Sequence, residues 1–171
     1  MHARSFIDSL DFARNGQKIS GEVLIAQLPR LLDVLENPRG VLSYKVQGVE
    51  DKHGIPALDV SITGSCQLRC QRCLNGLDYT IKLDTRLLLR NQASLDALND
   101  NVAGGEEEEF DSILADAHLD VLDLLEEEIL LSLPIAPKHE LSACQAAEGG
   151  NMQKEERNPF AVLAKLKHGN L

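Results

Sequence analysis

Two cysteines separated by two residues are the clearest chemical signal in the sequence. Cys70 and Cys73 have the spacing of a zinc knuckle, in which two thiolates from one tight turn occupy adjacent corners of a tetrahedron. A closed structural site needs two more ligands, and His139 and Cys144 are the obvious second pair. We therefore predict one structural zinc held by these four residues. The spacing alone leaves open that Cys70 and Cys73 are ordinary reduced thiols in a turn.

The other uses of cysteine fit the sequence less well. A thioredoxin-type Cys-x-x-Cys pair opens a helix after a strand, whereas a strand is expected to follow Cys73. Cys66 shares one face of its expected strand with Val60 and Ile62, so we assign it to the core. Four cysteines in 171 residues are too few for a disulfide scaffold. Metal binding is therefore a better interpretation of the pair than redox chemistry or a disulfide, with ordinary reduced thiols as the alternative that stays open.

No residue pattern predicts an enzyme. Glu126, Glu127 and Glu128 lie about 100° apart around a helix, so we expect them to be solvated rather than paired for acid–base catalysis. His53 and His118 lie in polar stretches without an identifiable triad partner. The sequence has no glycine-rich phosphate loop, no nucleophile elbow and no His-Glu-x-x-His motif.

The Cys-x-x-Cys pair is expected at the tip of a long hairpin. Apolar residues occupy every second position from Leu58 to Leu68 and again from Leu77 to Leu89, which predicts two strands with one buried face. Asn75-Gly76 between them tolerates a positive φ. Further strands are predicted near residues 19–25 and 41–49, and the short connections favour antiparallel pairing.

One helix is predicted with particular clarity. Asp120 is a good N-cap, residues 121–132 are strong helix formers, and Pro134 forces the helix to end. We therefore predict an α+β fold: an antiparallel sheet with a long hairpin, one main helix over about residues 120–132 packed on it, and short terminal helices.

The charge is unevenly distributed. Residues 91–150 hold 15 acidic residues and one basic residue, Lys138. No periodic apolar pattern is present between residues 91 and 118, which include the run Glu106 to Glu109. We predict a single α+β domain over residues 1–144 with a mobile acidic insertion at about 91–118. Residues 145–171 are predicted to be a flexible tail that ends in a short helix.

The composition also limits localisation and partners. The sequence has no 18-residue apolar run and no visible secretory signal, so we expect a cytoplasmic protein that is not membrane-bound. A net charge of −10 disfavours broad binding to bare RNA. The acidic middle of the chain would attract basic partners instead, and ribosomal proteins are one such class. The alternative is that the charge only solubilises the chain.

Four blocks of sequence together resemble a known family. They are Cys70-Gln71-Arg72-Cys73, the helix end from Glu126 to Pro134, Pro137-Lys138-His139 with Cys144 beyond it, and the block from Asn158 to Lys167. In this order and at these distances they resemble the bacterial YceD family, the large ribosomal RNA subunit accumulation proteins. The Asn-Pro-Phe-Ala-Val-Leu sequence that begins at Asn158 is the most specific part.

The resemblance implies a cytosolic factor that supports the synthesis, processing or stability of 23S rRNA, with no assigned catalytic activity. The implied partner is a pre-50S particle, a ribosomal protein or 23S rRNA, contacted directly or indirectly. The alternative is a small zinc- or redox-responsive cytosolic protein that acts through Cys70 and Cys73. A short amphipathic C-terminal helix is a candidate partner-binding element, and its contact residues would be Asn158, Pro159, Phe160, Leu163, Lys165 and Lys167.

Overall fold

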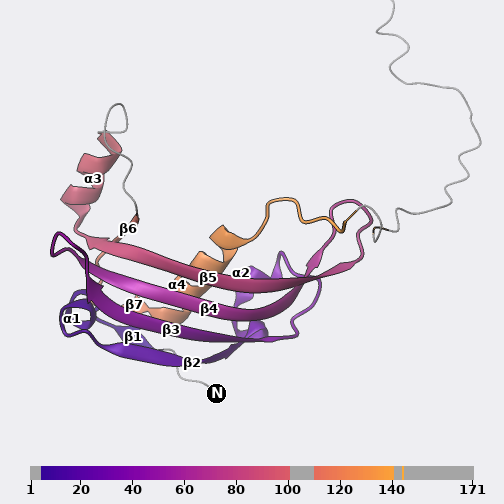
Figure 1. Ribbon diagram of the computed structural model, residues 1–171, viewed down its shortest axis with the longest axis horizontal. Coiled ribbons are helices and arrows are strands. Elements are labelled where there is room, and N and C mark those ends of the chain that lie inside the picture. The colour runs from indigo at the N-terminus through magenta and orange to yellow at the C-terminus, as the bar shows by residue number, and fades with distance from the viewer. Residues whose placement is uncertain (1–4, 101–109, 141–143, 145–171) are drawn as a thin grey trace, which may run out of the picture.

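The computed structural model describes residues 5–100, 110–140 and 144. It confirms the predicted α+β class (Figure 1). The elements in chain order are β1 (Phe6–Ile7), α1 (Ser9–Arg14), β2 (Lys18–Leu24), the 3-10 turn η1 (Ile25–Gln27), α2 (Pro29–Leu32), β3 (Val41–Glu50), β4 (Pro56–Arg69), β5 (Gly76–Arg90), α3 (Gln92–Asp100), β6 (Asp111–Leu114), β7 (Leu119–Asp120) and α4 (Val121–Ser132).

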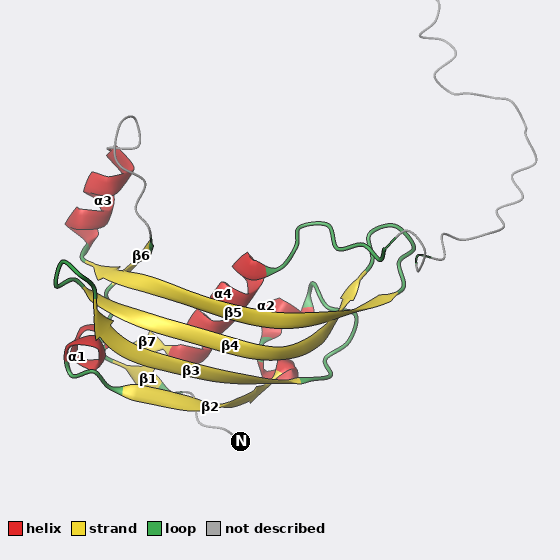
Figure 2. Ribbon diagram, viewed as in Figure 1, coloured by secondary structure: helices red, strands yellow, loops and turns green. Residues whose placement is uncertain are grey.

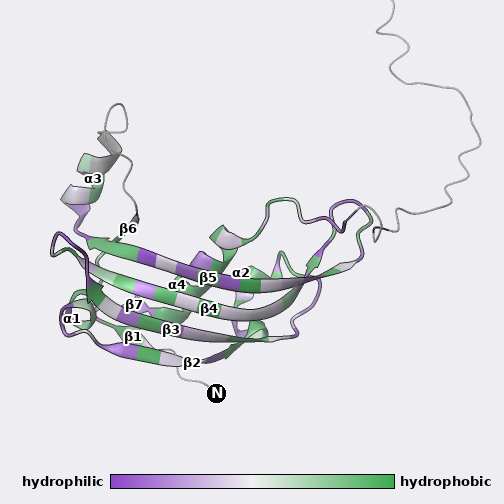
Figure 3. Ribbon diagram, in the orientation of Figure 1, coloured by the Kyte–Doolittle hydropathy of each residue, from purple (hydrophilic) through white to green (hydrophobic). Residues whose placement is uncertain are grey.

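A curved five-stranded sheet forms the centre of the fold, with strand order β2-β3-β4-β5-β6. β2 to β5 are antiparallel neighbours, as predicted from their short connections. β4 and β5 pair along nearly their whole length, from Ala57↔Leu88 to Arg69↔Gly76. Hydrophobic and hydrophilic segments alternate along these strands (Figure 3), so one face of the sheet packs on the core.

α4 covers the apolar face of the sheet, as its sequence predicted (Figure 2). The Asp120 side chain caps the helix by accepting the backbone N–H of Leu122 at 2.9 Å. Val121, Leu125 and Ile129 are fully buried against the sheet and the short helix α2. No helix in the described part of the chain is both long and apolar enough to cross a bilayer.

The expectation that all three glutamates of α4 are solvated is wrong for two of them. Glu126 is 1% exposed and Glu128 is 7% exposed, whereas Glu127 faces solvent. The Glu126 carboxylate accepts hydrogen bonds from the Leu31 backbone N–H and from Nε of Arg30, so it joins α4 to α2. These partners lie more than 90 residues away in the sequence, and helical spacing alone does not reveal them.

The segment after β5 also holds more regular structure than its sequence pattern indicates. α3 begins after Asn91, whose side-chain oxygen accepts the Ser94 N–H. β6 pairs in parallel with the end of β5, and the Arg86 guanidinium lies 5.3 Å from the Phe110 ring. β6 has only four residues, which is too short for a periodic apolar pattern to be recognised in the sequence.

Mobility of the insertion stays a prediction, and residues 101–109 lie outside the described residues.

Candidate metal centre

The Cys-x-x-Cys pair lies in the turn at the tip of the β4–β5 hairpin. The turn is closed by two backbone hydrogen bonds, from Leu74 N–H to the Cys70 carbonyl at 2.9 Å and from Cys70 N–H to the Asn75 carbonyl at 3.0 Å. Its one left-handed residue is Leu74, with φ of 62°, rather than Asn75 or Gly76. This conformation turns the backbone so that Cys70 and Cys73 converge on one side of the turn.

The turn prepares Cys70 to act as a ligand. Its side chain is buried, yet the pKa of the Cys70 thiol is lowered to about 5. The backbone N–H of Cys73 is the largest cause, and the backbone N–H groups of His139 and Arg72 add to it, against the opposing effect of burial. Amide donors that stabilise a thiolate favour the charged state that a metal ion requires.

The segment that follows α4 crosses the hairpin tip and brings the second pair of residues to the first. The Gln71 backbone N–H donates to the Pro137 carbonyl at 2.8 Å. Arg72 donates from Nη2 to the His139 carbonyl at 2.9 Å and from Nε to the Cys144 sulfur at 3.0 Å. The turn therefore binds this segment through backbone and guanidinium contacts as well as through the cluster itself.

The histidine is oriented with one ring nitrogen toward the thiols. His139 Nε2 lies 3.0 Å from the Gly76 carbonyl oxygen, which can only accept, so Nε2 carries the proton. Nδ1 is then the atom with a free lone pair, and it lies 3.4 Å from the Cys73 sulfur. A carbonyl that fixes the tautomer of a ligating imidazole is a common feature of metal sites.

All four candidate residues come together at one point. Their ligating atoms lie within 4.8 Å of one another, and the Cys70 and Cys144 sulfurs are 3.9 Å apart. Zinc bonds of about 2.3 Å to sulfur and about 2.0 Å to nitrogen place tetrahedral ligands about 3.5–3.8 Å apart. The group is therefore close enough to bind a metal ion. Cys66 lies in the core, as predicted, and burial raises the pKa of its thiol.

The neighbouring sulfurs act on Cys73 in the opposite sense to the amides at Cys70. The Asn75 backbone N–H lowers the pKa of Cys73, but burial and the neighbouring Cys144 and Cys70 sulfurs together raise it above its ordinary value. Three thiolates around a divalent cation would leave one net negative charge, and the Arg72 guanidinium, 3.0 Å from the Cys144 sulfur, would balance it. The sequence analysis did not assign roles to Arg72 or to the Gly76 carbonyl, because neither follows from the spacing of ligand residues.

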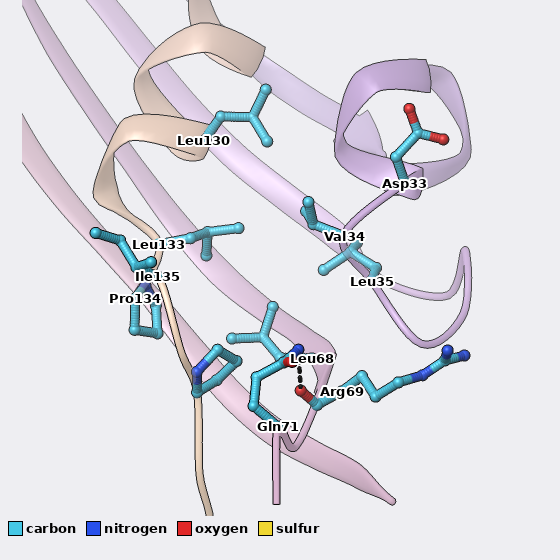
Figure 4. A pocket seen from close by; sticks show the side chains of 11 residues that line it. Asp33, Val34, Leu35, Leu68, Arg69, Gln71, Leu130, Leu133, Pro134 and Ile135 are labelled. Carbon is cyan, nitrogen blue, oxygen red and sulfur yellow. Dashed lines mark hydrogen bonds between the residues drawn. The ribbon is translucent and has the colours of Figure 1, made fainter. Parts of the chain in front are cut away.

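A groove of about 420 Å³, lined mostly by apolar side chains and called the apolar groove below, is shown in Figure 4. Its lining includes Arg69 and Gln71, the residues on either side of Cys70, so it adjoins the turn that carries the cluster. Leu130 and Leu133 from the end of α4 form one side, and Val34 and Leu35 form the other. Pro137, whose carbonyl accepts the Gln71 N–H of the turn, also lines the groove. One wall of the groove is thus the same segment that carries His139. The predicted partner-binding residues from Asn158 to Lys167 lie outside the described residues.

The comparisons with known proteins agree with the sequence resemblance. The family model described as large ribosomal RNA subunit accumulation protein YceD matches residues 58–167, a region that contains the whole cluster. The chain therefore belongs to the YceD family. The large ribosomal RNA subunit accumulation protein YceD of Haemophilus influenzae is 27% identical over 172 residues, and the match covers 94% of each chain. No solved structure is significantly similar to the chain.

Proposed function

We propose that this protein is a non-enzymatic, cytoplasmic factor that supports accumulation of 23S rRNA during assembly of the large ribosomal subunit. The match to the family model over residues 58–167 is the observation that carries this proposal. The hairpin tip, the segment after α4 that carries His139 and Cys144, and the block from Asn158 to Lys167 all fall within the match. We infer that the protein acts through an interaction surface on a pre-50S particle, a ribosomal protein or 23S rRNA.

Depletion of the protein in the organism that encodes it tests this function. The ratio of 23S to 16S rRNA should fall, and re-expression of the wild-type chain should restore it. Pull-down of the tagged protein should recover pre-50S particles, and crosslinks mapped to residues should identify the contacted component. An unchanged rRNA ratio under every growth condition tested would overturn the proposal.

We further propose that Cys70, Cys73, His139 and Cys144 hold one structural zinc ion. The convergence of three cysteines and one histidine, which are ligands suited to zinc, from two distant segments is the observation that supports it. Cys70 and Cys73 would supply two thiolates from the turn, Cys144 a third and His139 Nδ1 the nitrogen. A closed site of this kind would fix the chain after α4 to the hairpin tip.

Metal analysis of protein purified without chelators tests the site. Wild-type protein should contain close to one zinc ion per chain, and Cys73→Ser or His139→Ala should lower that content. Cys66→Ala is the matched control, because Cys66 is a cysteine of the same chain that lies in the core. Folded wild-type protein with no more zinc than the Cys73→Ser variant would exclude a zinc site. Loss of function in Cys73→Ser with intact folding and zinc would favour redox sensing instead.

The C-terminal block is proposed to bind the partner. Asn158, Pro159, Phe160, Leu163, Lys165 and Lys167 combine a helix start with apolar and basic side chains. Removal of residues 158–171 should leave most of the thermal stability and abolish association with pre-50S particles. Collapse of the whole fold in this deletion would assign Phe160 and Leu163 to the core.

A further inference from the structure

A second groove lies far from the metal centre, toward the opposite end of the sheet from the hairpin tip (Figure 1). It has a volume of about 580 Å³ and lies between β1, β6, β7 and the first two turns of α4. Its apolar lining includes Phe6 and Leu114, which are 57% and 47% exposed. Phe6 belongs to β1 and Leu114 to β6, so exposed apolar side chains reach the same groove from two different sheets, and apolar surface gathered in a groove is typical of an interaction site.

The groove is strongly acidic as well as apolar. Asp116, Asp123 and Glu127 line it and are exposed to solvent. Seven acidic residues and no lysine or arginine occur from Asp111 to Glu128. Arg30 of α2 donates to the Glu126 carboxylate and to the Asp123 carbonyl, and it lies near enough to Asp123 and Glu127 to interact with their charges. One arginine balances only part of the acidic charge of α4, and the remainder is available to a basic partner.

We propose that this groove binds an extended, lysine- and arginine-rich peptide segment of a partner protein. Basic side chains of the peptide would pair with Asp116, Asp123 and Glu127, and its apolar side chains would pack on Phe6 and Leu114. β6 is the edge strand of the sheet, and an extended peptide is the shape that suits a site beside a strand edge. Phosphate groups are repelled by such a surface, so the groove selects protein over RNA.

The proposal rests on the proposed function only for the identity of the partner. Basic extensions are characteristic of proteins that bind rRNA, because such extensions neutralise phosphates. A factor that holds one in an acidic groove would shield it from nonspecific contact with RNA. On this basis the direct contact at this groove is with a ribosomal protein, while the chemistry of the groove requires only a basic, partly apolar peptide.

Binding of a defined peptide to the full-length protein tests the groove directly. The probe is a fluorescein-labelled peptide of three Lys-Val-Arg-Leu repeats, measured by fluorescence anisotropy at low salt. A peptide of the same length with glutamate in place of each basic residue, and a single-stranded RNA of 12 nucleotides, serve as negative controls. The basic peptide should bind, and both controls should not.

Variants then locate the binding site. Asp123→Asn combined with Glu127→Gln should weaken binding about tenfold, or about 1.4 kcal/mol. Asp84→Asn combined with Glu22→Gln removes two exposed acids that do not line the groove and should change affinity less than about twofold. Phe6→Ala should also weaken binding, because the apolar side chains contribute. Circular dichroism should show each variant to be folded.

Equal loss of affinity in the two charge variants would show attraction to the overall negative charge and would overturn the proposal. Unchanged affinity in Phe6→Ala, or binding of the RNA in place of the peptide, would overturn it as well. The assay is independent of rRNA levels in cells. If the peptide binds but depletion of the protein leaves the 23S rRNA level unchanged, only the proposed function is contradicted. If the peptide does not bind but depletion lowers the 23S rRNA level, only the proposed peptide site is contradicted.

Discussion

The buried Glu126 offers a sharp test of how the fold is held together. α2 begins after Leu28, whose side chain cannot cap a helix, so the first N–H groups of α2 need another acceptor. Glu126 of α4 supplies it: Oε1 accepts the Leu31 N–H at 2.9 Å, and Oε2 accepts Nε of Arg30 at 3.1 Å. Leu31 is fully buried, so no water can replace this acceptor without rearrangement.

Replacement of Glu126 by alanine should destabilise the protein by about 3 kcal/mol. The buried Leu31 N–H would lose its acceptor, at a cost of about 1–3 kcal/mol. Arg30 is 49% exposed and can be resolvated, so its lost ion pair adds only about 0–1 kcal/mol. The space left by the side chain adds a further contribution, since Glu126 is 1% exposed.

Related substitutions should follow in a defined order. Glu126→Gln retains an acceptor for Leu31 and loses the charge, so it should cost about 1 kcal/mol. Arg30→Gln should cost about 1 kcal/mol or less, because the arginine is half-exposed. Glu127→Ala is the matched control, since Glu127 is exposed on the same helix, and it should change stability by less than about 0.5 kcal/mol.

Urea unfolding followed by circular dichroism at pH 7 measures these differences. The comparison requires similar m-values, so that changes in midpoint reflect stability. If Glu126→Ala falls within about 0.5 kcal/mol of Glu127→Ala, the carboxylate does not act as the acceptor for α2, and the reasoning fails.

Three further predictions concern single residues. Burial, with Asp111 and Glu127 nearby, raises the pKa of Glu128, so the fold favours its protonated form and loses stability as pH rises. Glu128→Gln should therefore stabilise the protein at pH 7.5 but not below about pH 4.5, as measured by urea unfolding at both pH values. A variant that is more stable than the wild type only at the acidic pH would contradict this prediction. Leu74→Gly should raise the free energy of unfolding by about 1 kcal/mol in the same assay, because Leu74 is exposed and has a positive φ. A lower free energy of unfolding would show that the Leu74 side chain itself stabilises the turn. Gly48→Ala should cost about 1–3 kcal/mol, because a Cβ there would meet the Phe12 and Ala13 backbone, and a wild-type melting temperature would refute that close approach.

The sequence predicted those elements whose signals are local. Alternation over more than ten residues identified β4 and β5, and a capping residue with a terminating proline bounded α4. β6 was not predicted, because its parallel pairing with Leu87 to Arg90 depends on a connection through α3 rather than on its own four residues. The burial of Glu126 was not predicted either, because it depends on contacts with α2, which is distant in the sequence.

In the candidate site too, some parts could be predicted from local sequence and others could not. Residue types and spacing were sufficient to name the four residues that converge at the hairpin tip, because few side chains bind zinc. The supporting contacts were not predictable. The Gly76 carbonyl that selects the His139 tautomer is a backbone group, and such groups carry no sequence signal. Arg72 lies inside the Cys-x-x-Cys motif, but its contact with Cys144 exists only in the folded chain.

The segment between α4 and His139 is the part of the fold that the proposed metal ion would stabilise most. Ile135 is fully exposed, so this stretch gains little from burial of its apolar side chains. Ordering a residue costs about 1–2 kcal/mol of backbone entropy, and a few hydrogen bonds of about 1 kcal/mol each do not offset that over the whole stretch. A structural zinc in the proposed site would contribute on the order of 10 kcal/mol to folding. If the site holds zinc, removal of the metal should therefore disturb the wall that this segment gives to the apolar groove, and it should leave the acidic groove at the other end of the sheet unchanged.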